Sequence, residues 1–477
     1  MTRHTLTSRA RRAVSLQRAL VAGLAGTSFA LLASCESGTE PTLGRRAQLS
    51  AQQQLSSADD REPNVTVVVG TGVPSIDVPA VQAAVDQGGT VRLKGHFSFD
   101  EAPTKLIAPS LSSGPPGQAY APAAEVVVSK AVTISGTGEA GDEMTTIDAG
   151  TIPFYVDAPG ERVTIRRLRF VKPISSAILV FAVRDLEIAS STIAGMVTYK
   201  TLSNGIGINT SGSPPTLAAP GAPENVSGTL NIRHNEIDMV GGTTADNTLG
   251  VLIFGVGTAG AAVDAHVTEN RISNTTEPAI NFRRIEGRAT VSHNVIATGS
   301  VAANVTRIQV IRVANTGVYR ITDNFIDCQW ANADAEAIGL FSNVASWPIE
   351  HAVVENNEVH MSAPAGTVFT AFSAGIGVFG FADSNIVRHN TIRGSARAGL
   401  SIPVFPLPPQ APTAPEGNAF VDNRLVQFTP AVADIFVGAH ALRTRIVGPG
   451  TVEDEGDGTI IERASHAGDA RSEHHRG

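Results

Sequence analysis

The sequence predicts an all-β solenoid, a parallel β-helix in which the chain winds through stacked coils of short strands. Three observations support this class: a repeated six-residue motif, a Gly-rich aliphatic segment upstream of most copies, and a repeat length of 24 to 35 residues, which is typical of solenoids. The motif reads apolar-x-x-Asn-x-aliphatic, and its seven copies are Ile232–Ile237, Val267–Ile272, Val291–Ile296, Ile321–Ile326, Val354–Val359, Val387–Ile392 and Phe420–Leu425.

The spacing inside the motif selects a strand, a tight turn and a second strand. Two apolar residues five positions apart, with Asn between them, do not share a helical face, whereas both point into the core across a turn. Asn tolerates the left-handed backbone that such a turn needs. Its amide can also bond the equivalent amide one coil away, so stacked copies form a ladder. The predicted ladder consists of Asn235, Asn270, Asn294, Asn324, Asn357, Asn390 and Asn423.

The upstream segments supply the third strand of each coil. They alternate small or polar residues with aliphatic ones, as in Gly205–Ile208, Ala279–Phe282, Ile311–Val313, Ile338–Leu340, Gly375–Val378 and Gly399–Ile402. Weaker copies of the pattern extend the count to about twelve coils, each rising ~4.8 Å.

These repeats resemble those of the pectin-lyase-like superfamily, whose parallel β-helices are right-handed. The resemblance covers roughly residues 65 to 461. It implies a single-domain, right-handed parallel β-helix. It implies little about activity, because one scaffold carries many functions.

The first 34 residues have the composition of a secretory signal. Five arginines without an acid precede the apolar run Ala19–Ala33, which is too short for a comfortable membrane span. The ending Leu32–Cys35 resembles the lipobox of bacterial lipoproteins. That resemblance implies cleavage before Cys35, its lipidation, and a membrane anchor in the bacterial cell envelope; Glu36, in place of Asp, favours the outer membrane. The alternative is an ordinary signal peptide that ends near a cysteine.

The rest of the chain divides into a tether, one domain and a tail. Residues 35–62 are polar and of low complexity, which predicts a flexible tether. Residues 63–463 form the β-helix domain, and residues 464–477 a disordered tail. Valines at helical spacing in Val78–Asp86 predict a short amphipathic helix that closes the first coil, because a solenoid needs terminal caps.

Charge and cysteine content exclude some classes of partner. The formal charge is −8, and removal of the five arginines in residues 1–34 makes it −13. An acidic body argues against nucleic acid and against an anionic bilayer surface as partners. Lipidation of Cys35 leaves Cys328 as the only thiol, so no intramolecular disulfide is expected, and Cys328 is interpreted as a packed core residue.

The outward side of the Gly-aliphatic strands is the predicted ligand-binding surface. Small residues leave it bare, two arginines lie in its middle, and phenylalanines follow at its edge. An extended acidic polysaccharide fits such a surface, because arginine pairs with carboxylates. Loops at 209–228, 342–352 and 403–418 are expected to wall it. The candidate residues are Asn281, Arg283, Arg312, Phe341 and Trp347. The alternative is purely structural, with small residues allowing close stacking and the phenylalanines covered by loops.

One further column precedes the ladder asparagines. It consists of His234, Glu269, His293, Asp323, Asn356, His389 and Asp422. His and carboxylate side chains suit transition metals, but a polar turn corner is the favoured explanation of the column, and we predict no metal there.

No catalytic motif of the superfamily occurs in the sequence. Its lyases use acids that hold Ca²⁺ with an arginine base, its hydrolases closely spaced aspartates, and its epimerases a Tyr-Gly-aromatic-Asp-Pro-His run. Here Glu277 and Glu286 flank Arg283–Arg284 only singly. Three hypotheses follow: a binding protein for an acidic polysaccharide, a divergent lyase or epimerase of uronate polymers, and a structural or adhesive rod. No cofactor is predicted, except Ca²⁺ for a lyase.

Overall fold

The computed structural model describes residues 65–100, 105–106, 123–138, 143–196, 203–210, 222–239, 248–298, 308–329, 335–404 and 414–463. The chain divides into two units, Met1–Arg61 and Glu62–Gly477, and every described residue belongs to the second. The predicted signal peptide, Cys35, the tether and the tail therefore lie outside the described residues. Within the described part, no helix is long and apolar enough to cross a membrane.

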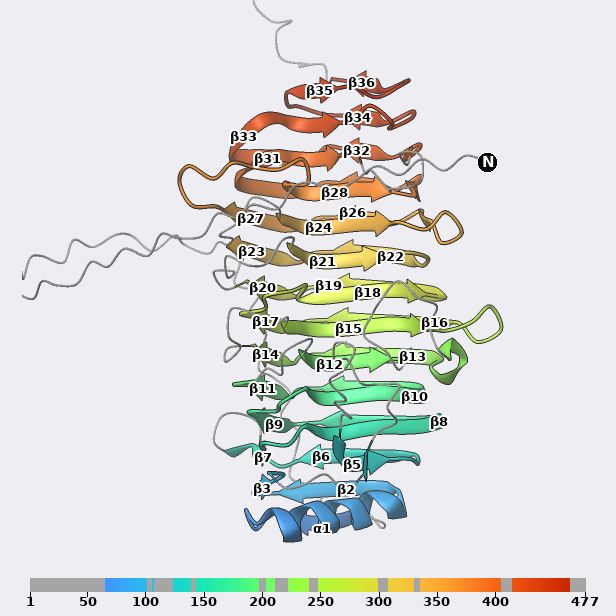
Figure 1. Ribbon diagram of the computed structural model, residues 1–477, viewed down its shortest axis with the longest axis vertical. Helices are drawn as coiled ribbons and strands as arrows, with labels where there is room; N and C mark the ends of the chain where they lie inside the picture. The colour runs from blue at the N-terminus through green and yellow to red at the C-terminus, as the bar shows by residue number, and fades with distance from the viewer. Residues whose placement is uncertain are drawn as a thin grey trace, which may run out of the picture. The chain divides into compact units, whose positions relative to one another are not determined.

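The described chain is a parallel β-helix, as predicted. Its strands stack in coils, from α1 (Pro74–Gln87) at one end to the last strand at the other (Figure 1). Three columns of strands make three faces. The long face carries the Gly-aliphatic strands β5 (Ala123–Val128), β8 (Ile152–Arg166), β10 (Ser176–Ala189), β12 (Ser203–Asn209), β15 (Thr248–Val256), β18 (Ile280–Ile285), β21 (Ile308–Ala314), β24 (Ala335–Ser342), β28 (Ala374–Gly380), β31 (Thr391–Ile402), β33 (Arg424–Val437) and β35 (Val452–Asp454).

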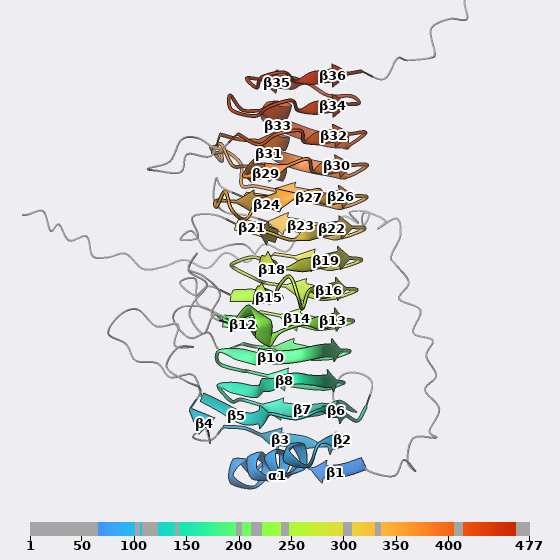
Figure 2. The same ribbon diagram turned by 90° about the vertical axis from the view of Figure 1, so that its right-hand side faces the viewer.

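The second face carries the strands that precede the asparagines and runs as one column in Figure 2. It comprises β1 (Val65–Val69), β2 (Gly89–Lys94), β6 (Val132–Gly136), parts of β8 and β10, β13 (Gly228–Arg233), β16 (Val263–Thr268), β19 (Gly287–Ser292), β22 (Val318–Thr322), β26 (Val353–Glu355), β30 (Ile386–Arg388), β32 (Ala419–Val421), β34 (Arg445–Val447) and β36 (Ile460–Glu462).

The third face carries the short strands that follow the asparagines. It comprises β3 (His96–Ser98), β7 (Thr145–Asp148), β9 (Leu168–Val171), β11 (Thr192–Ala194), β14 (Glu236–Asp238), β17 (Arg271–Ser273), β20 (Val295–Ala297), β23 (Phe325–Gln329), β27 (Glu358–Ser362) and parts of β31 and β33. Outside these columns, β4 (Lys105–Leu106) pairs antiparallel with β5, and β25 (Ile349–Glu350) pairs with β29 (Ala382–Asp383). A short 3-10 helix spans Pro223–Asn225.

The inward side chains of all three faces form one continuous core from Val68 to Ile446. Cys328 lies in this core, fully buried, and burial raises the pKa of its thiol to about 12. A thiol with so high a pKa is not ionised at neutral pH and is a poor nucleophile. The interpretation of Cys328 as a packed core residue is confirmed.

Helix α1 closes the first coil, as predicted, and starts four residues before the predicted helix. Val78, Val81 and Val85 are buried against the core. The buried Asp77 accepts hydrogen bonds from the backbone N–H groups of Gly72 (3.0 Å) and Ser98 (2.9 Å), which fixes the start of the helix. Gln82 pairs both ways with the backbone of Val127 on β5, at 2.8 and 2.9 Å. Its amide thus caps the backbone of Val127 at the edge of β5 that faces the helix.

The asparagine ladder is confirmed in all seven copies. In each step the Oδ1 atom of one Asn accepts from both the backbone N–H and the Nδ2 of the Asn one coil earlier; Asn294 donates to Asn324 in this way at 3.0 and 2.9 Å. The ladder starts at Ser191, whose N–H donates to Asn235 at 3.0 Å. The expectation that Asn itself adopts the left-handed conformation is wrong. Positive φ falls on the preceding residue, as at His234 (55°), which lets the asparagine point inward while its neighbour points outward.

The C-terminal coils contain a second ladder that the sequence analysis missed. Asn418 accepts from the backbone N–H and the Nδ2 of Asn385, both at 3.0 Å, and Asn385 accepts from the N–H of Ala352 at 2.8 Å. These asparagines stand five residues before Asn390 and Asn423. The signal was therefore present, but only in the last two copies of the motif.

Candidate functional site on the long face

The outward side of the long face changes character along the stack. One aligned position runs through the paired strands as Val127, Tyr155, Leu179, Gly207, Leu252, Asn281, Arg312, Gly339, Gly377 and Ser401. The early coils therefore place mainly apolar groups there, and the middle coils on β18 and β21 place an amide and a guanidinium.

Two arginines and one carboxylate meet on these middle coils. Arg283 on β18 and Arg312 on β21 both act electrostatically on Glu277, which lies three residues before β18. Burial raises the pKa of Glu277, and the two guanidinium groups oppose that shift. Burial likewise lowers the pKa of Arg283, and Glu277 opposes it. All three groups are half-buried, so their charges interact in a partly desolvated setting, where electrostatic effects are strong.

Buried amides lie beside these charges. Asn281 is the register partner of Arg312 and is 1% exposed. Among the described residues, neither its Oδ1 nor its Nδ2 has a hydrogen-bond partner, and the same holds for the Nε2 of the buried Gln309. An unsatisfied buried amide costs free energy, so such groups mark places where a further polar partner belongs.

Aromatic rings border the cluster on the next two coils. Arg312 lies over the ring of Phe341, with its Cζ 5.4 Å from the centroid. Phe341 packs against Phe379 at 5.4 Å, and Phe372 meets Phe379 edge-on at 6.3 Å. The structure therefore brings together four of the five predicted ligand-binding residues, Asn281, Arg283, Arg312 and Phe341, and adds Glu277, which the sequence analysis treated as an isolated acid.

Trp347, the fifth predicted residue, is placed differently. It lies in the loop after β24, and the Cζ atom of Arg284 sits 4.3 Å from its ring centroid. One face of the indole is therefore covered by a guanidinium and does not serve as an open platform for a sugar ring.

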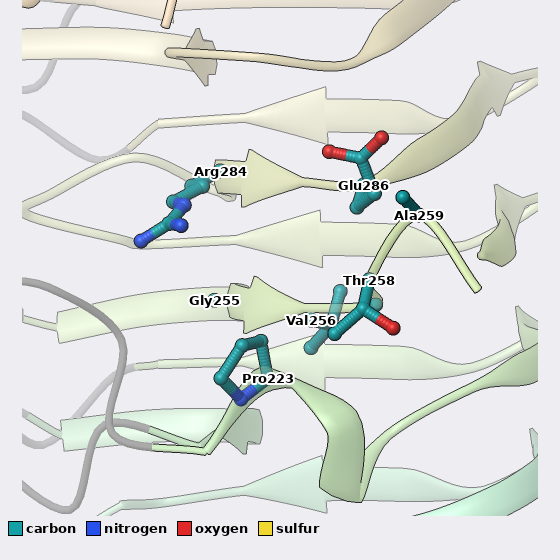
Figure 3. A pocket seen from close by; sticks show the side chains of 8 residues that line it. Pro223, Gly255, Val256, Thr258, Ala259, Arg284 and Glu286 are labelled. Carbon is teal, nitrogen blue, oxygen red and sulfur yellow. The ribbon is translucent and has the colours of Figure 1, made fainter. Parts of the chain in front are cut away.

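A cavity of about 210 Å³ opens at the corner where β15 and β18 end. Figure 3 shows its lining: Pro223, Gly255, Val256, Thr258, Ala259, Arg284 and Glu286, with Gly257 completing it. Arg284 and Glu286 have no role predicted from the sequence, because single charges at a strand end form no pattern.

The outward column at the asparagine corner is a set of turn residues. Each member has positive φ, from 49° at Asp422 to 58° at Glu269 and His293. His234 and Glu269 form a pair with 2.7 Å between Nε2 and Oε2. Among the described residues, no group of three His, Cys, Asp or Glu side chains could hold a metal ion.

Of the loops expected to wall the long face, residues 211–221 and 405–413 lie outside the described residues. The loop at 342–352 is described and carries Trp347. Its Ser342 Oγ donates to the carbonyl of Trp347 at 2.8 Å, which holds the loop close to the end of β24.

Comparison with known proteins reveals fold-level likeness only. No family model matches the sequence, and no curated protein matches it. Among solved structures, an alginate lyase from Paenibacillus sp. str. FPU-7 is similar at 13% identity and TM-score 0.36, over 70% of this chain and 97% of that one. PfbA, a surface adhesin of Streptococcus pneumoniae, is similar at 11% identity and TM-score 0.39, over 83% and 93%.

The A-module of the Azotobacter vinelandii mannuronan C-5 epimerase AlgE6 is similar at 14% identity and TM-score 0.32, over 81% of this chain and 91% of that one. TM-scores this low carry no argument about function. The chain's own coils show the parallel β-helix that was predicted from the repeats.

Proposed function

We propose that this protein binds an acidic polysaccharide on the middle coils of the long face. The observation that carries the proposal is Asn281, a buried amide without a hydrogen-bond partner among the described residues, set beside Arg283 and Arg312. Two guanidinium groups recognise the carboxylates of successive uronate residues. Glu277 holds the arginines in place before the ligand arrives.

Affinity electrophoresis through gels containing pectate, alginate or a glycosaminoglycan tests this proposal. The full-length protein is expected to be retarded, and less so as salt rises, because screening weakens charge pairs. Arg312→Ala is expected to lose most of the retardation. Arg320→Ala is the matched control: Arg320 lies on the neighbouring β22, faces outward from the second face and pairs with Glu355. Absent or salt-insensitive retardation would overturn the proposal.

A second function, a divergent lyase or epimerase of uronate polymers, is favoured by Glu277. A half-buried carboxylate with a raised pKa, next to two cations, is suited to proton transfer. A lyase predicts a rise in ultraviolet absorbance from unsaturated uronate product. An epimerase predicts exchange of the C5 proton with solvent. Both signals should vanish in Glu277→Gln. If the wild-type protein binds the polymer and gives neither signal, the enzyme hypothesis is rejected and the binding hypothesis stands.

We also propose that the mature protein is anchored in the bacterial cell envelope through lipidated Cys35. The lipobox-like ending at Leu32–Cys35 supports this proposal. The full-length protein is expected to incorporate labelled palmitate and to sediment with membranes. Cys35→Ala should abolish the label and release the protein, whereas sedimentation of both forms would contradict the anchor.

A further inference from the structure

The cavity lies at the corner where β15 and β18 end. One residue there, Arg284, differs in type from the residues at the equivalent position in the other coils. Gly255, Arg284, Asn315, Ser342 and Gly380 occupy equivalent positions in successive coils, at or just after paired residues of the long face. Four of them have positive φ: Gly255 (64°), Arg284 (55°), Asn315 (64°) and Gly380 (82°). Glycine and asparagine adopt this conformation readily, and a long side chain does so only at a cost. The backbone therefore gives no reason for an arginine at this position.

Arg284 is held where it is by contact with Trp347, at 4.3 Å. Stacking on the indole restricts a side chain that otherwise samples many rotamers. Arg284 is half-buried, and burial lowers its pKa, with Glu286 opposing the shift. The guanidinium is thus partly stripped of water and fixed at the wall of the cavity.

No ion pair of the described residues neutralises Arg284. Glu286, two residues further on, also lines the cavity, but Figure 3 shows the charged ends of the two side chains directed away from each other. Arg284 and Glu286 thus line the cavity at different places. Thr258 adds a hydroxyl, and Pro223 and Val256 add apolar surface.

Backbone hydrogen bonds connect the walls of this cavity. The N–H of Gly257 donates to the carbonyls of Pro223 (3.0 Å) and Val226 (3.1 Å), which ties the 3-10 helix to the end of β15. Thr258 and Ala261 exchange two backbone hydrogen bonds, at 3.0 and 3.1 Å, and close the turn above it. A site built this way needs little ordering when a ligand binds.

We propose that this cavity binds one carboxylate-bearing sugar residue, a uronate. The inference rests on the proposed function in its choice of ligand class, and the site is additional to the cluster around Arg312. Arg284 pairs with the carboxylate, and Glu286 and Thr258 accept hydrogen bonds from hydroxyl groups. Glu286 also disfavours a second carboxylate. A volume of about 210 Å³ gives room for a single sugar ring.

Calorimetric titration of the full-length protein with galacturonate, galactose and galactarate tests the ligand class. Galacturonate is expected to bind, galactose to bind at least tenfold more weakly for lack of the charge-assisted pair, and the dicarboxylate galactarate to bind more weakly than galacturonate. Equal binding of galacturonate and galactose, or no binding of either, would overturn the proposal.

Arg284→Gly separates binding from folding, because the preceding coil carries glycine, Gly255, at the equivalent position. The variant is expected to keep or raise the melting temperature while losing about tenfold or more in galacturonate affinity. Arg397→Ala is the control: Arg397 stacks on Phe436 at 4.4 Å, on β31, away from the cavity. It should leave galacturonate binding unchanged. Unchanged affinity in Arg284→Gly, or equal loss in both variants, would contradict the assignment.

The two proposals fail in different ways. Retardation by a polyuronate with no galacturonate binding overturns the cavity site and leaves the long-face proposal standing. Galacturonate binding that depends on Arg284, without retardation by any polymer, supports the cavity site and overturns the long-face proposal.

Discussion

The asparagine corner and the long face belong to the same coils and follow opposite rules. At the corner, each coil from Asn235 to Asn423 repeats one hydrogen-bond pattern, with amide distances of 2.9 to 3.0 Å. On the long face, one aligned outward position changes from Leu179 through Gly207 and Leu252 to Asn281 and Arg312. The hydrogen-bond pattern at the corner is therefore the same in every coil, whereas the residue type on the long face changes from coil to coil.

This difference arises because the two positions differ in whether their side chains need a hydrogen-bond partner in the neighbouring coil. An inward asparagine needs a matching amide one coil away, so a single change breaks two steps of the ladder. An outward side chain on the long face needs nothing from the neighbouring coil, so each coil can carry different chemistry. Repetition therefore indicates the fold, and departures from repetition indicate the function.

The largest effect is expected from breaking the ladder in its middle. Asn324→Ala removes the acceptor for the N–H and Nδ2 of Asn294 and the donor to Val291, and should lower the free energy of unfolding by about 1–3 kcal/mol. Asn423→Ala should cost less, because no asparagine follows it in the described ladder. Urea unfolding of both variants measures the difference, and equal losses would contradict the ladder.

A pH-dependent effect is expected from Glu125, a buried carboxylate on the apolar coils of the long face. Glu125 accepts from the N–H groups of Thr151 (2.8 Å) and Ile152 (3.0 Å), and burial raises its pKa from 4.5 to about 7. The folded protein therefore holds this proton more tightly than the unfolded chain. Stability should fall by about 2–3 kcal/mol as pH rises from about 4.5 to 7 and then level off.

Glu125→Gln provides the control for that pH dependence. It removes the titrating group, so the contribution to the slope between pH 4.5 and 7 should disappear while polyuronate binding stays unchanged. Thermal unfolding across this pH range makes the comparison, and an identical slope in the wild-type protein and the variant would show that Glu125 does not titrate in this window.

A smaller loss is expected from the second ladder. Asn385→Ala removes the acceptor for Ala352 and the amide bond to Asn418, which should cost about 1 kcal/mol. The effect is smaller because this ladder has two asparagines, against seven at the main corner. A loss as large as that of Asn324→Ala would show that ladder length does not matter.

The smallest effect on stability is expected from Gly339→Ala. A Cβ atom there would lie 2.4 Å from the Nε2 of Gln309, the far end of a flexible side chain. Gln309 should move aside at a cost below about 1 kcal/mol, with a few-fold loss in polyuronate affinity. Gly260→Ala, where a Cβ meets nothing within 4 Å, should change neither quantity. Intact affinity in Gly339→Ala would exclude Gln309 from the site.

The sequence predicted the fold because the ladder and the inward aliphatic residues recur at a constant spacing. It missed Asn385 and Asn418 because two copies do not make a visible period. It placed Asn281, Arg283 and Arg312 on one surface, because alternation along a strand fixes which side chains point outward. It did not predict the roles of Glu277, Arg284 and Glu286 in the two sites. Their positions depend on the conformation of a loop and of a corner turn, which the repeat pattern does not determine.

The most direct test of the difference between the asparagine corner and the long face is affinity electrophoresis in polyuronate gels at low and high salt. It compares the full-length wild-type protein with its Arg312→Ala and Asn324→Ala variants. At a temperature where all forms are folded, we predict that Arg312→Ala abolishes the salt-sensitive retardation and that Asn324→Ala retains it. Equal retardation of the wild-type protein and Arg312→Ala would contradict the account. It would leave the long face as an irregular but passive side of a structural β-helix.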